Sequence, residues 1–466
     1  MFRELPRYPL YHHPIGWLEA VPAHWVRRRF GTVLREKDVR SVAGEEQLLR
    51  VSQYTGVTER RTESGEGLDS RSESLIGYKK VAKRQLAVNI MLAWNGSLGV
   101  SRYDGIVSPA YCVYSFKENA DPWYFHHLLR SPQFKARIKA NSRGIVDSRL
   151  RLYSEDLYRL EAVVPPVEEQ SAIVKYLAHA NARIDKAIAA KRHLIALLEE
   201  QTAFVSRQVL SGRSIEGIDL DSGDRVPWLG RVPAAWGALP LKRLSKLRSG
   251  AGFPVDRQGR MNQELPFFRV SDMGYPGNEV FLDYCDSTVS RDESAELGAV
   301  IFEPESICFP KVGGALLTNK RRILKRSSCL DNNLMGAAFF GLEVDYAYEI
   351  MKLVDMSDVA KPGPVPAVGQ GDVGRIVLPV PPKEVQHALV EALRLSQQES
   401  ARAADVASRE IALLQEFRTR LVADVVTGQA DVRAIASTLP DAPEALDNLI
   451  ARPDDDLEES LSEGEE

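Results

Sequence analysis

The sequence predicts an α+β protein in which a β-rich domain followed by a long helix occurs twice. Two pairs of matching stretches support this prediction. WLEAVPAHW begins at Trp17 and WLGRVPAAW begins at Trp228, while PPVEEQSAIV begins at Pro165 and PPKEVQHALV begins at Pro381. A heptad pattern of apolar residues after each Pro-Pro pair predicts the two helices. Self-similarity of this kind is the signature of an internal repeat.

The repeat keeps its register through the end of each copy. Residues 216 positions apart match without a gap. The matching pairs are Asp156 with Asp372, Arg159 with Arg375, Glu168 with Glu384, Gln170 with Gln386, Ala196-Leu197-Leu198 with Ala412-Leu413-Leu414, and Gly212 with Gly428. An ungapped match over about 60 residues indicates two copies of one sequence.

Each shared segment is predicted to be one helix, because it follows Pro-Pro, contains no internal Gly or Pro, and reaches Gly212 or Gly428 at its end. The first heptad stripe consists of Val174, Leu177, Asn181, Ile184, Ile188, Lys191, Ile195, Leu198, Thr202, Val205 and Val209. The second consists of Val390, Leu393, Gln397, Ser400, Ala404, Ala407, Ile411, Leu414, Arg418, Leu421 and Val425. A helix of about 45 residues is roughly 68 Å long, too long for one small domain to cover. We therefore expect the two helices to pack on each other.

Polar residues interrupt both stripes. They include Asn181, Lys191, Ser400 and Arg418. Such residues would set the register of the helix pair or mark the place where another subunit binds.

The blocks between the matching stretches, roughly 18–164 and 229–380, contain short β-like runs such as QLAVNIMLAW and AVIFEPESICF. Their ends match but their interiors differ, which indicates one scaffold with two different binding surfaces. The predicted domains are a β-rich domain at 1–164, a helix at 165–212, a linker at 213–227, a second β-rich domain at 228–380, a second helix at 381–428 and an acidic tail at 429–466.

The charge of the chain is unevenly distributed. The net charge is −4, but residues 453–466, PDDDLEESLSEGEE, carry eight acidic groups and no basic ones, so the rest of the chain is net positive. We expect the tail to be disordered, because it has too little apolar content to fold. Basic clusters lie at Arg27–Arg29, Lys79–Arg84 and Lys320–Arg322. They suit a polyanion, although each such cluster alone is more often an ordinary solvated surface.

Apolar runs and cysteine spacing also indicate where in the cell the protein acts. The sequence has no run of about 20 apolar residues and no secretory signal order at its start, so we expect a cytoplasmic protein. Its cysteines, Cys112, Cys285, Cys308 and Cys329, are widely spaced without a CxxC pair. This predicts reduced thiols and neither a zinc site nor a disulfide framework.

No motif for catalysis is present. The sequence lacks GxGxxG after a strand, GxxxxGK[ST], NPPY or DPPY, and HExxH. The pairs His12-His13 and His126-His127 have no acidic neighbours at ligand spacing and are interpreted as surface or packing residues. We therefore expect the chain to bind no metal and no cofactor and to catalyse nothing by itself.

Polar and aromatic groups at predicted turns are candidates for contacts with a nucleic acid. In the first block the candidates are Lys79, Lys80, Lys83 and Arg84 for phosphates, Trp94, Asn95, Ser97, Arg102 and Tyr103 around a glycine-rich turn, and Arg143 and Arg149 near the end. Asn and Arg are the types that read adenine and guanine edges, and Lys and Arg hold phosphates. The alternative for each residue is an ordinary solvated hairpin.

The second block offers a corresponding set in and after FPKVGGALLTNKRRIL. The candidates are Lys311, Thr318, Asn319, Lys320, Arg321, Arg322, Asn332 and Lys361. Apart from the phosphate role of the four basic residues in the first block, the sequence does not show which of these candidates read bases.

The repeated WLxxVPxxW stretches and the repeated PPxxEQ-like helix starts resemble the specificity (S) subunit of type I restriction-modification systems. The helix starts are Pro165-Pro166-Val167-Glu168-Glu169-Gln170 and Pro381-Pro382-Lys383-Glu384-Val385-Gln386. A VTG ending occurs intact at Val426-Thr427-Gly428 and altered at Leu210-Ser211-Gly212. The resemblance runs from about residue 14 to residue 430, in the same order twice.

The resemblance implies two target recognition domains joined by an antiparallel coiled coil with a pseudo-twofold internal repeat. Each domain would read one half of a bipartite site on double-stranded DNA. Two methyltransferase (M) subunits and restriction/translocase (R) subunits would be the partners, and S-adenosylmethionine, ATP and Mg would bind to them. Candidate partner-binding residues on the helices are Glu168, Gln170, Lys191, Glu384, Gln386 and Arg418.

Two departures from the family pattern stand out: Val385 in the second helix start, where the first has Glu169, and the acidic tail beyond Gly428. They leave open a related phage-defence system, in which the chain would be a scaffold or a DNA-targeting subunit. A scaffold that binds no DNA would be distinguished by the lack of salt-sensitive DNA binding.

Overall fold

The computed structural model describes residues 5–12, 18, 20–60, 74–146, 149–213, 223–361, 363 and 365–441. The chain divides into two compact units. Unit 1 comprises Met1–His193 and Ala407–Glu466, and unit 2 comprises Leu194–Val406. Trp17, His13 and the strongly acidic residues 453–466 lie outside the described residues.

Two helices of 44 residues are the longest elements: α5 is Val167–Leu210 and α10 is Lys383–Val426. They form where the absence of Gly and Pro predicts them. The residues of α5 up to His193 belong to unit 1, as do those of α10 from Ala407 onward. None of the described helices is long and apolar enough to cross a membrane.

Unit 1 is a mixed α and β structure around one main sheet. Its strands are β1 (Tyr11–His12), β2 (Val21–Pro22), β3 (Val26–Arg29), β4 (Leu34–Lys37), β5 (Leu49–Ser52), β6 (Gly56–Glu59), β7 (Lys79–Val81), β8 (Leu86–Asn89), β9 (Leu98–Val100), β10 (Gly105–Val107), β11 (Tyr111–Phe116) and β12 (Glu161–Val164). Its shorter helices are α1 (Phe30–Val33), η1 (Ala93–Asn95), α2 (Pro122–Arg130), α3 (Pro132–Ala140), α4 (Ser154–Arg159) and α11 (Arg433–Thr438).

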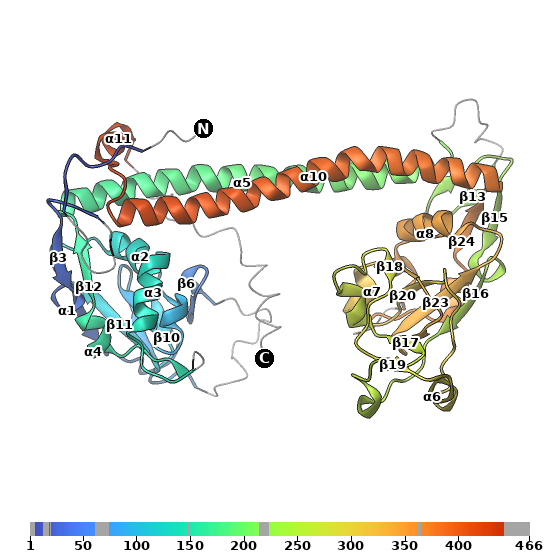
Figure 1. Cartoon of the computed structure of the whole chain (residues 1–466), viewed down its shortest axis with the longest axis horizontal. Helices are drawn as coiled ribbons and strands as arrows, with labels where there is room; N and C mark the ends of the chain where they lie inside the picture. The colour runs from blue at the N-terminus through green and yellow to red at the C-terminus, as the bar shows by residue number, and fades with distance from the viewer. Residues whose placement is uncertain are drawn as a thin grey trace. The chain divides into compact units, whose positions relative to one another are not determined.

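The main sheet of unit 1 is antiparallel, in the order β4-β11-β8-β9. Helices α2 and α3 lie beside each other next to the strands of unit 1 (Figure 1). Helix α2 contacts β9, and α3 contacts η1. Asp121 and Ser131 start these helices because their side chains accept hydrogen bonds from the first-turn N–H groups of Trp123 and Phe134. The apolar faces of the helices and the sheet form the core.

Unit 2 has a sheet of the same strand order with one strand added. Its strands are β13 (Arg225–Val226), β14 (Gly230–Arg231), β15 (Gly237–Pro240), β16 (Ser245–Ser249), β17 (Leu265–Phe268), β18 (Phe281–Leu282), β19 (Thr288–Val289), β20 (Ile307–Pro310), β21 (Arg322–Leu324), β22 (Cys329–Leu330), β23 (Leu334–Phe339) and β24 (Val377–Val380). Its shorter helices are η3 (Leu241–Arg243), η4 (Val255–Arg257), η5 (Val270–Gly274), α6 (Arg291–Glu296), α7 (Gly314–Leu317), α8 (Val344–Leu353), η6 (Met356–Val359) and α9 (Gln370–Gly374).

The strand orders β4-β11-β8-β9 in unit 1 and β16-β23-β20-β21-β18 in unit 2 correspond from the first strand onward. Each unit also pairs its first long strand with the strand that leads into its long helix, as β3–β12 and β15–β24. Unit 2 adds the three-stranded sheet β19-β17-β22, which has its own small core. The repeated ends of the sequence therefore build equivalent elements, and the unlike middles build different ones.

The prediction that the tail is disordered from residue 429 onward is wrong for residues 429–441, which are folded in unit 1. Ala430, Val432 and Ala436 are buried in the unit 1 core, and α11 forms there. The Asp431 N–H donates to the Pro6 carbonyl at 2.8 Å, and Gln429 Nε2 donates to the Ala20 carbonyl at 2.9 Å. Eight of the acidic residues of 429–466 lie in residues 453–466, so the average composition of the tail conceals this apolar start.

Candidate nucleic-acid interface

The four basic candidates of the β7–β8 region fall into two pairs. Lys79 is buried, with its Nζ 3.8 Å from Asp38, and Lys80 is ion-paired with Glu46 at 2.6 Å. Lys83 and Arg84 are exposed in the turn that follows, where Arg84 has φ +66°. The turn therefore presents Lys83 and Arg84 to solvent, while the role of phosphate contact assigned to Lys79 is wrong because its side chain is buried.

Several candidate side chains of the glycine-rich turn in the first block are more buried than the sequence indicates. Ser97 is buried and cannot reach a base edge, which corrects that prediction. Trp94 is half-buried, with Lys139 Nζ 4.9 Å from its ring centroid. Asn95 is half-buried on η1, and Arg102 lies over the Trp123 ring at 4.8 Å. Arg102 is thus held beside an aromatic plane.

Arg143 and Arg149, near the end of the first block, are both exposed. Arg143 donates to Asp156 at 2.7 Å, and its guanidinium lies 5.6 Å from the Tyr153 ring centroid. This ion pair fixes Arg143 to α4, so a phosphate contact from it would have to compete with a carboxylate.

In the second block, the predicted cluster around residue 320 divides into buried and exposed members. Arg321 is 2% exposed and donates to the Val354 carbonyl at 3.1 Å and to Asn319 Oδ1 at 2.8 Å. Burial lowers its pKa to about 10, so it stays charged near neutral pH. The prediction that Arg321 contacts DNA is therefore wrong. This side chain instead supports the turn at Asn319, where φ is +51°.

The remaining candidates of the second block have mixed surroundings. Thr318, Lys320, Asn332 and Lys361 are exposed, whereas Lys311 donates to Ser249 Oγ at 3.3 Å and Arg322 donates to the Met273 carbonyl at 3.0 Å. Thr318 and Lys320 share the turn between α7 and β21, whereas Asn332 and Lys361 lie on two other segments of unit 2.

Gln170 and Gln386 do not face a partner, which corrects their assignment. Both are 1% exposed and lie one turn into the long helices. Gln170 Oε1 accepts from the Asp121 N–H at 2.8 Å, and Gln386 Oε1 accepts from the Glu343 N–H at 2.7 Å. Asp121 and Glu343 are the N-caps of α2 and α8, so the same glutamine joins helix to domain in each unit.

Two of the other helix candidates pair across the helices rather than outward. In unit 1, Arg418 pairs with Asp185, and Lys191 pairs with Glu410 at 2.6 Å. Residue numbers thus increase along α5 as they decrease along α10, so this part of the helix pair is antiparallel. In unit 2, Gln397 Nε2 donates to Ser206 Oγ at 3.0 Å. Glu168 and Glu384 are exposed.

Glu169 is a buried acceptor that the sequence did not single out. Tyr8 Oη and Trp25 Nε1 donate to its carboxylate at 2.6 and 3.0 Å, and His24 Nε2 lies 2.6 Å from it. Burial, followed by the Glu169 carboxylate, raises the pKa of Tyr8, so the phenol keeps its proton and donates. The one indication of this role in the sequence was that the second helix start has Val385 at the place of Glu169, because a valine side chain cannot accept hydrogen bonds.

The glycines at the helix ends explain the WLxxVPxxW motif. Gly428 has φ +77°, and a Cβ built on it would lie 2.5 Å from Pro22 Cδ and 3.2 Å from the Trp25 ring. Gly212 has φ +78°, and its Cβ would lie 2.7 Å from Pro233 Cγ and 2.8 Å from the Trp236 ring. The Pro and second Trp of each motif therefore receive a helix end so closely that only glycine fits.

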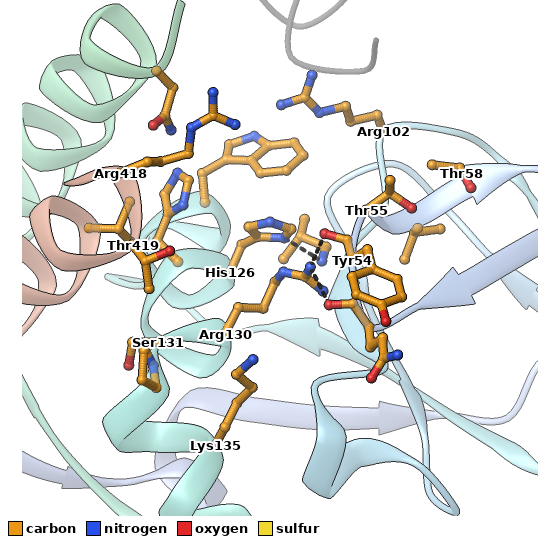
Figure 2. A pocket seen from close by; sticks show the side chains of 18 of the residues that line it. Tyr54, Thr55, Thr58, Arg102, His126, Arg130, Ser131, Lys135, Arg418 and Thr419 are labelled. Carbon is orange, nitrogen blue, oxygen red and sulfur yellow. Dashed lines mark hydrogen bonds between the residues drawn. The ribbon is translucent and has the colours of Figure 1, made fainter. Parts of the chain in front are cut away.

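A pocket of about 440 Å³ in unit 1, here named the unit 1 crevice, lies between α2, the β5–β6 turn and the long helices. Figure 2 shows Arg418 and Arg102 in the upper part of the view, with His126 and Arg130 on α2 below them. Arg130 donates to the carbonyls of Ser52, Gln53, Tyr54, Gly96 and Leu98. This arginine fixes the β5–β6 turn as one wall of the crevice.

The described residues contain no group of three or more His, Cys, Asp or Glu side chains arranged to hold a metal ion. Burial raises the pKa of Cys308 to about 12 and that of Cys329 to about 11, which disfavours the thiolate that a nucleophile would need.

No family model matches the sequence, and no curated protein matches it. A chain of the type I R-M system, from a study of its complex assembly and conformational transition, is 16% identical with a TM-score of 0.57, over 88% of this chain and 99% of that one. The HsdS subunit from Thermoanaerobacter tengcongensis is 18% identical, with a TM-score of 0.42, over 88% of this chain and 98% of that one.

The S subunit of a type I restriction-modification system from M. genitalium is 13% identical, with a TM-score of 0.32, over 86% of this chain and 96% of that one. At such identities the likeness concerns the fold, and the first of the three comparisons carries it. The chain therefore has the fold of a chain from the type I R-M system.

Proposed function

We propose that this chain is the sequence-specific DNA-recognition subunit of a type I restriction-modification complex. The observation that carries the proposal is the repeated architecture. Both units contain the same order of strands, a buried glutamine that binds the N-cap of a domain helix, and a glycine at the end of the long helix, while their exposed turns differ. A scaffold that repeats while its surfaces diverge suits a reader of two unlike half-sites. The fold likeness to a type I R-M chain supports the same function.

In this proposal, residues 1–164 and 228–380 are the two target recognition domains, each reading half of a bipartite target on double-stranded DNA. Residues 165–212 and 381–428 form the antiparallel coiled coil that separates them, with 213–227 as the linker between copies. The exposed Lys83, Arg84 and Lys320 are the best-placed phosphate contacts. In this proposal the chain catalyses no reaction by itself, and it acts in the cytoplasm.

The partners we infer are two methyltransferase subunits and restriction/translocase subunits. Exposed Glu168 and Glu384 stand at equivalent positions of the two helix starts, which suits two copies of one partner. S-adenosylmethionine, ATP and Mg would bind to those partners, which would supply adenine methylation, translocation and cleavage.

The test is to express the chain with the methyltransferase subunit of its own system in a host without adenine methylation, and to map methylated adenines by single-molecule sequencing. A bipartite motif with an unread gap is the expected result. A stable complex that leaves the genome unmethylated would overturn the proposal in favour of a scaffold or targeting subunit of a related phage-defence system.

A further inference from the structure

The pairing registers of the two main sheets identify equivalent residues inside the blocks whose sequences differ. Leu86 of β8 pairs with Tyr114 of β11 in unit 1. Ile307 of β20 pairs with Ala337 of β23 in unit 2. On the other side, β8 pairs with β9 and β20 pairs with β21. Leu86 and Ile307 are the first residues of their strands, so the turn before β8 corresponds to the turn before β20.

The two turns, Ala82–Gln85 and Glu303–Ser306, have the same backbone geometry. In each turn the N–H of the fourth residue donates to the carbonyl of the first, at 3.1 Å in unit 1 and 3.3 Å in unit 2. The third residue, Arg84 or Glu305, has a positive φ of +66° or +64°. Its N–H donates at 2.8 Å to a carbonyl, at the end of β21 in unit 2 and one residue past the end of β9 in unit 1. Hydrogen bonds therefore hold both turns in one conformation.

The positive φ is unusual for the residues that adopt it here. Five described residues other than glycine have a positive φ, and three of them are asparagines, which tolerate it. The other two are Arg84 and Glu305, at equivalent positions of the two units. Such a conformation costs about 1 to 3 kcal/mol in other residues, and it is found preferentially at binding and active sites. The observation points to a function for the side chain at this position.

The two turns present side chains of opposite charge. In unit 1, Lys83 and Arg84 are exposed, and neither has an ion pair among the described residues. Asp104 accepts from the Lys83 N–H at 2.9 Å, and the turn stays net positive with this carboxylate included. In unit 2, Glu303 and Glu305 are exposed and also lack an ion pair within the described part of the chain. Unit 1 thus presents cations where unit 2 presents carboxylates.

The cations that follow β21 do not neutralise the acidic turn. Lys325 and Arg326 come directly after this strand. Both pair with Asp283, with N–O distances of 2.8 and 3.7 Å. The two glutamates of the turn therefore keep their full effect on a charged partner.

We propose that the two turns are one DNA-contact position, which binds a backbone phosphate in unit 1 and repels the related phosphate in unit 2. This inference rests on the proposed function, because it requires both domains to present the same face to DNA. Cations on a fixed turn attract a phosphate without reading sequence, whereas carboxylates at the same place oppose its approach. The half-site read by unit 1 is therefore held by a phosphate contact that the other half-site lacks.

The test is phosphate-ethylation interference on the full chain in complex with its methyltransferase subunits, bound to a duplex that carries the methylated motif. Ethylation of one phosphate at the unit 1 half-site should weaken binding about tenfold, because it removes a charge-assisted contact. Ethylation of the related phosphate at the unit 2 half-site should have no effect. Equal interference at the two phosphates would overturn the proposal.

A double variant removes the cations and assigns the interference to the turn. Lys83→Gln combined with Arg84→Asn should keep the fold, since both side chains are exposed and asparagine tolerates a positive φ. The interference at the unit 1 half-site should disappear. The plot of log K against log salt concentration should become shallower by about 2, one for each lost phosphate contact. Persistence of the interference in this variant would contradict the assignment.

A converse variant tests the equivalence of the two turns. Glu305→Arg places in unit 2 the residue type that unit 1 has at this position. Interference should then appear at the related phosphate, and the salt dependence should steepen by about 1. Asp256→Arg makes the same charge change at an exposed residue of η4 and should create no interference there.

The outcomes separate this inference from the proposed function. An interference pattern that is the same in all variants would refute the inference and leave DNA recognition intact. A complex of the unmodified chain that binds no DNA would overturn the proposed function, and the inference with it.

Discussion

His127 connects the stability of unit 1 to pH. Its folded-state pKa is about 4, lowered by burial and then by Arg130 and Arg102, whereas an unfolded histidine binds a proton near pH 6.5. Below pH 6.5 the unfolded chain therefore binds more protons, and stability is lost as the pH falls toward 4. Neighbouring His126 follows the same direction, and its Nδ1 accepts from the Val100 N–H at 3.1 Å.

We expect the free energy of unfolding, measured with urea at pH 7.5, 6.0 and 5.0, to fall less steeply in His127→Gln than in the unmodified chain. His193→Gln, which changes an exposed histidine, is the control and should keep the original slope. Identical slopes for all three proteins would show that His127 does not titrate differently on folding.

Glu169 offers a second residue-scale prediction. Glu169→Val places in the first helix start the residue type that the second has at Val385, and it leaves Tyr8 and Trp25 as donors without their acceptor. The expected loss is about 2 to 4 kcal/mol in the free energy of unfolding of unit 1, measured with urea. Glu168→Gln alters an exposed neighbour and should cost little. Comparable losses in the two variants would refute the role of the buried carboxylate.

The sequence identified residues whose chemistry suits DNA contact, but it did not show which of them are exposed. Lys83, Arg84 and Lys320 are exposed as expected. Arg321 is not, because Val354 and Phe309, distant in the sequence, cover it. Gln170 looked like a surface residue of a helix start, yet the N-cap of α2, about 50 residues earlier, binds it. Burial of this kind depends on contacts between distant segments, and periodicity along one segment carries no information about them.

At the scale of elements, the glycine ends of the long helices permit a controlled test. Gly428→Ala combines a positive φ with a Cβ 2.5 Å from Pro22, whereas Gly341→Ala combines a positive φ of +89° with open space. Backbone strain alone costs about 1 kcal/mol, and overpacking adds roughly 1 to 3 kcal/mol. Gly428→Ala should therefore lower the free energy of unfolding of unit 1 by more than Gly341→Ala lowers that of unit 2.

Urea unfolding followed by Trp fluorescence would measure both variants, because Trp25 and Trp236 are buried in units 1 and 2 respectively. A loss in Gly428→Ala no larger than in Gly341→Ala would mean that the motif yields to the added methyl. The motif would then not fix the helix end.

The long helices were the elements most predictable from sequence, because the absence of Gly and Pro together with one apolar period extends over 44 residues. Short elements were not. α11 has six residues and no N-cap side chain, and it forms because Val432 and Ala436 are buried in the unit 1 core. The strands of unit 2 include a three-stranded sheet, β19-β17-β22, and the described residues of unit 1 form no three-stranded sheet. The repeat therefore could not reveal it.

At the scale of the whole molecule, the proposed function predicts that recognition is modular. Replacing residues 26–160 with the corresponding block of a related chain should change one half of the methylated motif and preserve the other. The junctions lie immediately before β3 and immediately before β12, so the exchanged block supplies its own β3, which pairs with the β12 of this chain. Methylome sequencing is the measurement. A motif that changed in both halves, or in neither, would contradict two independent readers.

The length of the helix pair supplies the last prediction. Lys191 and Glu410 form an ion pair at 2.6 Å, so a heptad inserted after Lys191 and another before Glu410 would preserve their facing residues. Each insertion adds about 10 Å, equivalent to roughly three base pairs of DNA rise. If the helices set the separation of two readers, the unread gap in the methylated motif should widen by that amount while both half-sites stay the same. An insertion in α5 alone is the control and should abolish methylation, because the register of the pair is lost. A double-insertion chain that still methylates with the original gap would show that the helices do not set the spacing.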